Sequence, residues 1–215
     1  MKKNLRLVTS GVMIALAFVL SLLKPFDLPF GGSVTLFSMV PIVLLGCMYG
    51  VKWGLFCGTV NGILQALMGA FGASKAFAGL GALEIVLMCF LDYIAAFAVI
   101  GLGGIFVSGA LKKQKSIVGA CALGAFVATA LRYLVHFISG AILFGGYAEW
   151  FFTEKFVNRF GNWILDTFSG TALSVVYSLV YNGLYMIPEI IITVAGTALL
   201  LSCPPIKKRV LDARQ

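Results

Sequence analysis

The chain has 215 residues, of which 60% are hydrophobic and only 11% are charged, and its mean hydropathy is +1.02. A soluble domain uses about 45–50% apolar and about 25% charged residues, and a core of this size cannot hide so much apolar surface, so a water-soluble fold is excluded. The net charge of +8 is not interleaved with exposed aromatic residues, which argues against a nucleic-acid-binding protein.

The apolar residues form long continuous runs, which predict membrane-spanning helices. In lipid every backbone N–H and C=O needs an internal partner, so only helices and closed barrels can span. A barrel strand alternates apolar and polar residues, and these runs do not. We therefore expect an all-α integral membrane protein, with residues 1–215 forming a single six-helix membrane domain.

Six helices are expected in chain order, separated by loops rich in Gly, Pro or polar residues. The first run follows three basic residues like a signal peptide, but it lacks a small-x-small cleavage site, so we expect it to be retained. The expected helices are Leu7–Leu23, Val34–Tyr49, Lys52–Gly69, a long one from about Gly81 to Phe106, Ile117–Phe144, and a last one after Phe168 that ends near Ser202. The expected loops are Lys24–Ser33, Ala70–Gly81 and Gly145–Phe168.

The distribution of Lys and Arg predicts the orientation. With the N-terminus inside, six spans place 11 of these residues in inner segments and 4 in outer segments, and Arg132 lies within a helix. An excess of positive charge on cytoplasmic segments is the rule for membrane proteins. Both termini are therefore expected in the cytoplasm, where the basic residues would face anionic lipid.

Five ionisable residues fall within the expected spans: Glu84, Asp92, Arg132, His136 and Glu189. Such residues cost several kcal/mol in the bilayer, so each is a candidate functional residue. Asp92 needs a cation or several hydrogen-bond donors, and a cationic ligand would supply one.

Structural alternatives stay open for the other ionisable residues. Arg132 and His136 share a helix face, so Arg132 can be a structural cation for Glu189 or a loop carbonyl, and His136 a core histidine or a ligand contact. Glu84 lies close to the outer end of its helix, where it would be partly solvated. Glu189 follows Pro188 and can stabilise a kinked helix.

Depth in the membrane brings the remaining candidates together. At 1.5 Å per residue, Asp92 lies roughly 15–20 Å and His136 roughly 12 Å from the outer surface. Tyr177 and Asn182 fall in the outer half and middle of the last helix. Tyr177 begins a stripe with two further tyrosines, which is either packing or an aromatic wall. These residues predict one cavity that opens outward.

Motifs for catalysis are absent from the sequence. There is no Walker loop, HExxH or GxSxG motif, and one histidine cannot make a His-rich metal site. The five cysteines show no CxxC pair, so we expect free thiols. We expect neither an enzyme nor a bound cofactor or metal. The pair Gly11-x-x-x-Ala15 would let another helix approach closely and predicts docking of a partner.

Four segments of the chain carry a resemblance to a known family. The segments are Gly31-Gly32-Ser33-Val34-Thr35-Leu36 with Met39-Val40-Pro41-Ile42; Leu91-Asp92-Tyr93-x-x-Ala96-Phe97 with Gly101-Leu102-Gly103-Gly104; Arg132-Tyr133-x-x-His136-Phe137-x-x-Gly140; and Tyr177-Ser178-x-x-Tyr181-Asn182-Gly183-x-Tyr185-x-x-Pro188-Glu189. The first resembles the first loop and second helix of substrate-binding (S) components of energy-coupling factor transporters. The other three resemble helices 4, 5 and 6 of the thiamine-specific (ThiT-type) branch, and the similarity covers essentially the whole chain in order.

The resemblance implies a subunit of the bacterial plasma membrane that captures thiamine from outside. It implies a partner module of one transmembrane coupling protein and two cytoplasmic ATPases, with Gly11 and Ala15 against the coupling protein. The implied substrate-binding residues are Asp92, Tyr93, His136, Tyr177 and Asn182. Asp92 would offset the thiazolium charge of thiamine, and Tyr177 would stack on the rings of thiamine.

The chain departs from the family beside the implied pocket. Phe144 stands where some members have a tryptophan, and Trp150 or Trp163 are alternative stacking residues. The loop after the fifth helix is long, and the first loop, with Phe26, Phe30 and Gly31-Gly32, is a candidate lid. The competing functions are an S component for riboflavin or a precursor such as hydroxymethylpyrimidine, a stand-alone secondary transporter, and a membrane enzyme.

Overall fold

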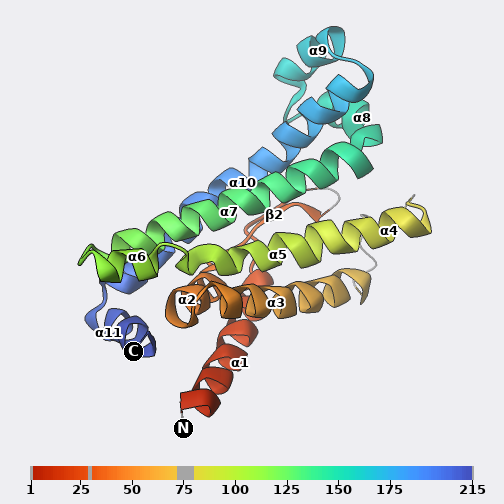
Figure 1. Cartoon of the computed structure of the whole chain (residues 1–215). Helices are drawn as coiled ribbons and strands as arrows, with labels where there is room; N and C mark the ends of the chain where they lie inside the picture. Colours follow the sequence, from red (N-terminus) through yellow and green to blue (C-terminus); the bar gives the residue numbers. More distant parts are fainter. Residues whose placement is uncertain (1, 29–30, 72–79, 215) are drawn as a thin grey trace.

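The computed structural model describes residues 2–28, 31–71 and 80–214, and nearly all of them are helical (Figure 1). The expected lid residue Phe30 and most of the expected loop Ala70–Gly81 lie outside these ranges. The helices are α1 (Lys2–Ser21), α2 (Val40–Tyr49), α3 (Val51–Phe71), α4 (Ala82–Met88), α5 (Ala96–Ala98), α6 (Val107–Lys112), α7 (Ile117–Leu143), α8 (Ala148–Thr153), α9 (Asn158–Thr167), α10 (Gly170–Ser202) and α11 (Pro204–Ala213).

Three shorter helical segments and one small hairpin complete the described chain. The π-helical η3 (Cys89–Ala95) and the 3₁₀-helical η4 (Val99–Gly104) join α4, α5 and α6 into one rod. The 3₁₀ turn η5 (Gly145–Tyr147) follows α7. Strands β1 (Phe26–Asp27) and β2 (Ser33–Val34) pair antiparallel.

Four helical stretches are long and apolar enough to cross a membrane: Lys3–Ser21, Ala82–Lys112, Ile117–Leu143 and Gly170–Ser202. The chain is thus a multi-pass membrane protein whose described part is built from helices. The ten residues of α2 extend only about 15 Å, against a hydrocarbon core of about 30 Å, and every residue from Val40 to Met48 is buried. Other parts of the protein therefore cover most of the surface of α2.

The expected helix Val34–Tyr49 begins later than the sequence predicted. Val34 pairs with Phe26 in the hairpin, and α2 starts at Val40 with Pro41 in its first turn. Proline favours this position because it has no N–H to satisfy there.

The expected loop Gly145–Phe168 is also different, because it contains α8 and α9. Apolar side chains from these short helices, Phe151, Phe152 and Ile164, are buried, while polar residues face outward. Mixed polarity of this kind resembles a loop when only mean hydropathy is considered. A further helix, α11, follows Ser202.

A seam of glycines holds the rod Ala82–Lys112 against its neighbours. Gly101 of η4 lies against the backbone of Gly54 in α3, and Gly46 of α2 lies against Gly101. On another side, Gly124 of α7 meets the carbonyl of Gly103. Helices in lipid associate through such close backbone approach, since lipid tails compete equally well for apolar side chains.

The C-terminal segment closes one end of this seam. Arg214 donates from Nε to the Cys47 carbonyl at 2.6 Å and from Nη2 to the Gly46 carbonyl at 3.0 Å. These carbonyls belong to the last turn of α2, where the helix leaves carbonyl groups short of donors, and Arg214 supplements the Gly50 N–H that bonds the Gly46 carbonyl. Arg214 therefore fixes α11 at the same end of the molecule as the start of α1 (Figure 1).

The seam predicts a strong effect of one added methyl group. Gly101→Ala would place a Cβ inside the backbone of Gly54, so we expect a loss of about 1–3 kcal/mol in stability, read as a lower unfolding midpoint in detergent. Gly109→Ala in α6 is the matched control, because nothing lies within 4 Å of its Cβ position. Equal midpoints for the two variants would contradict this role of the seam.

Candidate functional site

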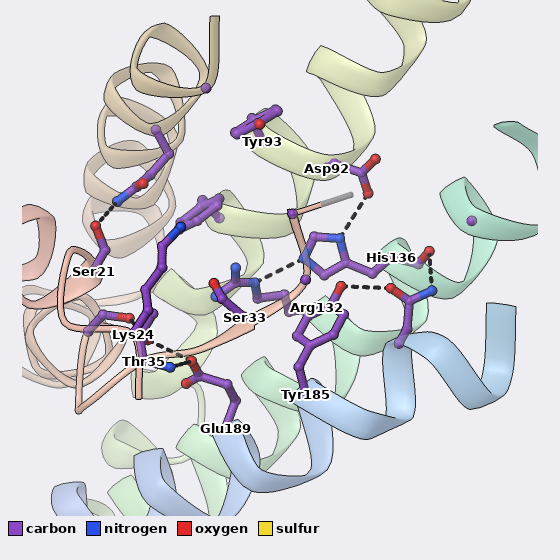
Figure 2. Close-up of a pocket in the computed structure, with 18 of the residues that line it drawn as sticks. Ser21, Lys24, Ser33, Thr35, Asp92, Tyr93, Arg132, His136, Tyr185 and Glu189 are labelled. Atoms are coloured by element: carbon purple, nitrogen blue, oxygen red, sulfur yellow. Dashed lines mark hydrogen bonds and ion pairs between the residues drawn. The ribbon is translucent and has the colours of Figure 1, made fainter. Parts of the chain in front are cut away.

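A cavity of about 470 Å³ lies between the C-terminal end of α1, the hairpin loop, α3, the rod, α7 and α10 (Figure 2). Its volume is in the range of small-molecule sites. The polar residues on its walls are drawn from segments far apart in the chain, among them Lys24, Asp92, His136 and Glu189.

Hydrogen bonds link three ionisable side chains on one wall of the cavity (Figure 2). Arg132 Nε donates to His136 Nε2 at 3.2 Å, and His136 Nδ1 lies 2.8 Å from Asp92 Oδ1. Because Nε2 accepts from the guanidinium, the imidazole proton is on Nδ1, which donates to the carboxylate. His136 is thus a neutral bridge between a cation and an anion.

Asp92 is held by neutral donors. Its second oxygen, Oδ2, accepts a hydrogen bond from Ser139 Oγ at 2.7 Å. The Asp92 side chain keeps 19% of its surface accessible, whereas His136 keeps 9%. The carboxylate is therefore oriented by the protein and still faces the cavity.

The π-helical segment η3 presents two consecutive residues to this cavity. Asp92 and Tyr93 both lie in η3 and both line the cavity. In a regular α-helix consecutive residues do not share a face. The wider i→i+5 turn is rare and is often found at functional sites.

Asn182 of α10 is fixed by hydrogen bonds on both ends of its amide. Its Nδ2 donates to the Ser178 carbonyl at 2.9 Å and to the His136 carbonyl at 3.2 Å, and its Oδ1 accepts from Tyr185 OH at 2.6 Å. The Tyr185 ring also meets the His136 ring edge-on, with centroids 5.9 Å apart. These contacts hold α10 against α7 beside the cavity.

Aromatic rings form the wall beside these polar groups. Tyr177 is 2% exposed and packs against Tyr181 at 5.5 Å and Phe151 at 5.3 Å between centroids. Phe144 also lines the cavity. The tyrosine stripe therefore has both of the expected roles, since it packs against α8 and faces the cavity.

The first loop is tied down over the cavity at two points. Glu189 Oε1 accepts from the Thr35 N–H at 2.5 Å and from Thr35 Oγ1 at 2.6 Å. Gly32 N–H donates to Tyr181 OH at 3.2 Å. The other oxygen of Glu189 is buried without a partner in the part of the chain that the structure describes.

The cavity gathers the candidates Asp92, Tyr93, His136, Tyr177 and Asn182. Three other candidates lie elsewhere. Trp150 and Trp163 are 39% and 64% exposed and are not on the cavity wall. Glu84 accepts from the Gly81 N–H at the exposed start of α4.

The partner considered for Arg132 in the sequence is different in the structure. Its guanidinium contacts His136 and lies over the Phe97 ring, 4.2 Å from the ring centroid. Sequence reasoning missed Ser139 and Thr35. Ser139 lies three residues after His136 on the same helix face, which is a usable signal, whereas nothing in the sequence pairs Thr35 with Glu189. No group of three metal-ligating side chains converges among the described residues.

Comparison with known proteins gives one family. Residues 7–150 match the family model described as Thiamine transporter protein (Thia_YuaJ). Thiamine transporter ThiT of Bacillus subtilis is 33% identical over 212 residues, covering 95% of this chain and 94% of that protein. Thiamine transporter ThiT of Lacticaseibacillus paracasei is 26% identical, covering 79% and 73%. A solved structure of ThiT from Listeria monocytogenes shares the fold, with a TM-score of 0.70, 21% identity, and coverage of 98% and 99%.

The loop tether predicts a local change in dynamics. Tyr181→Phe removes the acceptor for the Gly32 N–H, so amide hydrogen exchange in a peptide covering residues 26–36 should accelerate about fivefold, as expected for a bond of about 1 kcal/mol. Tyr133→Phe is the control, because its hydroxyl bonds the Leu179 carbonyl instead. Equal exchange rates in the two variants would contradict the tether.

Proposed function

Because the chain belongs to the Thiamine transporter protein family, we propose that its cavity binds thiamine and that the chain captures it from the extracellular side. Its relatives are named as transporters rather than enzymes, so its role is transport. The observation that carries the proposal for the site is the charge arrangement around Asp92.

Asp92 suits a ligand with a permanent positive charge. Its Oδ1 lies 2.8 Å from His136 Nδ1, and this imidazole is neutral while its Nε2 accepts from Arg132. The carboxylate is thus stabilised by hydrogen bonds while its charge is not cancelled by an adjoining cation. The thiazolium ring of thiamine would supply that cation, and the attraction is strong where water is excluded.

The other candidates suit the aminopyrimidine and the flat shape of thiamine. Tyr177 and Tyr93 offer ring faces, and Phe144 takes the position of the family's tryptophan. His136 and Asn182 are held by their own hydrogen bonds, so little side-chain freedom remains to be lost on binding. We assign these residues to substrate binding on this basis.

We also propose six membrane crossings with both termini in the cytoplasm. Four crossings are the four long spans. The other two would be α3, which has 21 residues, and the buried α2 together with the loop that precedes it. The cavity lies at the C-terminal end of α1, away from Lys3 and Arg6 at its start. With the basic end inside, the cavity belongs to the outer half of the membrane.

An energy-coupling factor module is the proposed partner, with one transmembrane coupling protein and two cytoplasmic ATPases. The chain carries no Walker loop, so it needs an external source of energy. Gly11 and Ala15 are exposed on α1, and nothing lies within 4 Å of a Cβ built on Gly11. This open strip of α1 is available to a helix of the coupling protein.

Thiamine binding to the purified chain tests the function. We expect saturable binding of radiolabelled thiamine in equilibrium dialysis, and Asp92→Asn should weaken binding at least about tenfold, since a desolvated charge pair is worth more than about 1.4 kcal/mol. Glu84→Gln is the matched control, because it removes an exposed carboxylate from the same rod. If Asp92→Asn binds as tightly as the control, the ligand is neutral, as hydroxymethylpyrimidine would be.

Docking is tested separately. Gly11→Leu with Ala15→Leu should abolish co-purification with the coupling protein and ATPases and leave thiamine affinity unchanged, because both residues are remote from the cavity. Val19→Leu, an exposed change on the same helix, is the control. Gradient-driven thiamine uptake by the chain alone in proteoliposomes would instead identify a secondary transporter.

A further inference from the structure

A second cleft, of about 310 Å³, lies at the opposite end of α1 from the cavity, where the first turns of α1 meet α11 and the end of α2. Its charged lining consists of three cations and one carboxylate. They are Lys3, Arg6, Arg209 and Asp212. The cleft therefore has a net positive charge and would attract an anion.

Arg6 is held in an orientation suited to anion binding. Its guanidinium lies over the Trp53 ring, 4.0 Å from the centroid, and its Nε is buried without a hydrogen-bond partner in the described chain. Trp53 Nε1 in turn donates to Ser10 Oγ at 2.9 Å. Because Nε is buried, a phosphate in the cleft would reach this guanidinium through its terminal Nη groups, and stacking on Trp53 holds the planar group in place for that contact.

An apolar groove of about 550 Å³ runs alongside the cleft between α1, α2, α10 and α11. Its walls include Met13 and Leu16 of α1, Leu44 of α2 and Leu200 of α10. Arg209 lines both the groove and the cleft, so the two hollows meet at this residue. The apolar groove thus lies directly beside the cationic cleft.

We propose that cleft and groove together bind one anionic glycerophospholipid, with its phosphate in the cleft and an acyl chain in the groove. A free phosphate would use the cleft and leave the groove empty, whereas a neutral lipid would gain nothing from three cations. Basic pockets between helices on the cytoplasmic side of membrane proteins bind anionic headgroups in this way. The charge complementarity and the shared Arg209 favour this occupant over a partner helix.

Native mass spectrometry of the purified full chain tests the proposal. Equal amounts of dioleoyl phosphatidylglycerol and dioleoyl phosphatidylcholine are added. We expect the protein to retain about five times more of the anionic lipid, because one charge contact near the membrane surface is worth about 1 kcal/mol. R209Q should reduce this preference, because it leaves two cations and one carboxylate in the cleft. K115Q, which removes an exposed charge outside both hollows, should leave it unchanged.

The groove has its own pair of variants. L16W should fill the groove and reduce retention of phosphatidylglycerol, whereas L7W, at an exposed position of α1 outside the groove, should not. The lipid-free unfolding midpoints of all four variants report their folding. Equal retention of both lipids, equal loss in R209Q and K115Q, competition by inorganic phosphate with no effect of L16W, or a dimer in place of the lipid-bound monomer would each overturn the proposal.

Discussion

Close backbone contact between the rod Ala82–Lys112 and the neighbouring helices determines how the helices of this protein pack. Gly101 of the rod lies against the backbone of α3, and Gly124 of α7 lies against the rod's Gly103 carbonyl, without intervening side chains. Since these contacts leave little freedom for sliding, they also set the position of η3 further along the same rod. Asp92 in η3 then lies directly opposite His136 of α7.

The cavity shows how this membrane protein accommodates charged side chains in its interior. Two carboxylates and two cations line it, but they are separated by an imidazole, hydroxyl groups and backbone amides rather than paired directly. Direct pairing would lower the cost of burial and cancel the charge that a ligand can use. The arrangement around Asp92 therefore suits recognition of a cation better than structural support.

The helix α1 connects the three surfaces proposed to act in this protein. Its C-terminal end borders the cavity, its exposed strip carries Gly11 and Ala15, and its first turns border the basic cleft. Only Ser10 and Ala17 among its described side chains are buried. A helix with so few internal contacts depends on what surrounds it, either lipid or another protein, for much of its stability.

The amino-acid sequence alone was enough to predict the membrane class and several helix boundaries, because hydropathy depends only on the order of residues along the chain. Tyr49 and Ile117 were placed correctly as helix ends. Only the tertiary structure decided which side chains meet across helices, since rotation about each helix axis is set by packing. That is why the pairing of Thr35 with Glu189, the contact of Arg132 with His136 rather than Glu189, and the buried faces of α8 and α9 emerged only from the fold.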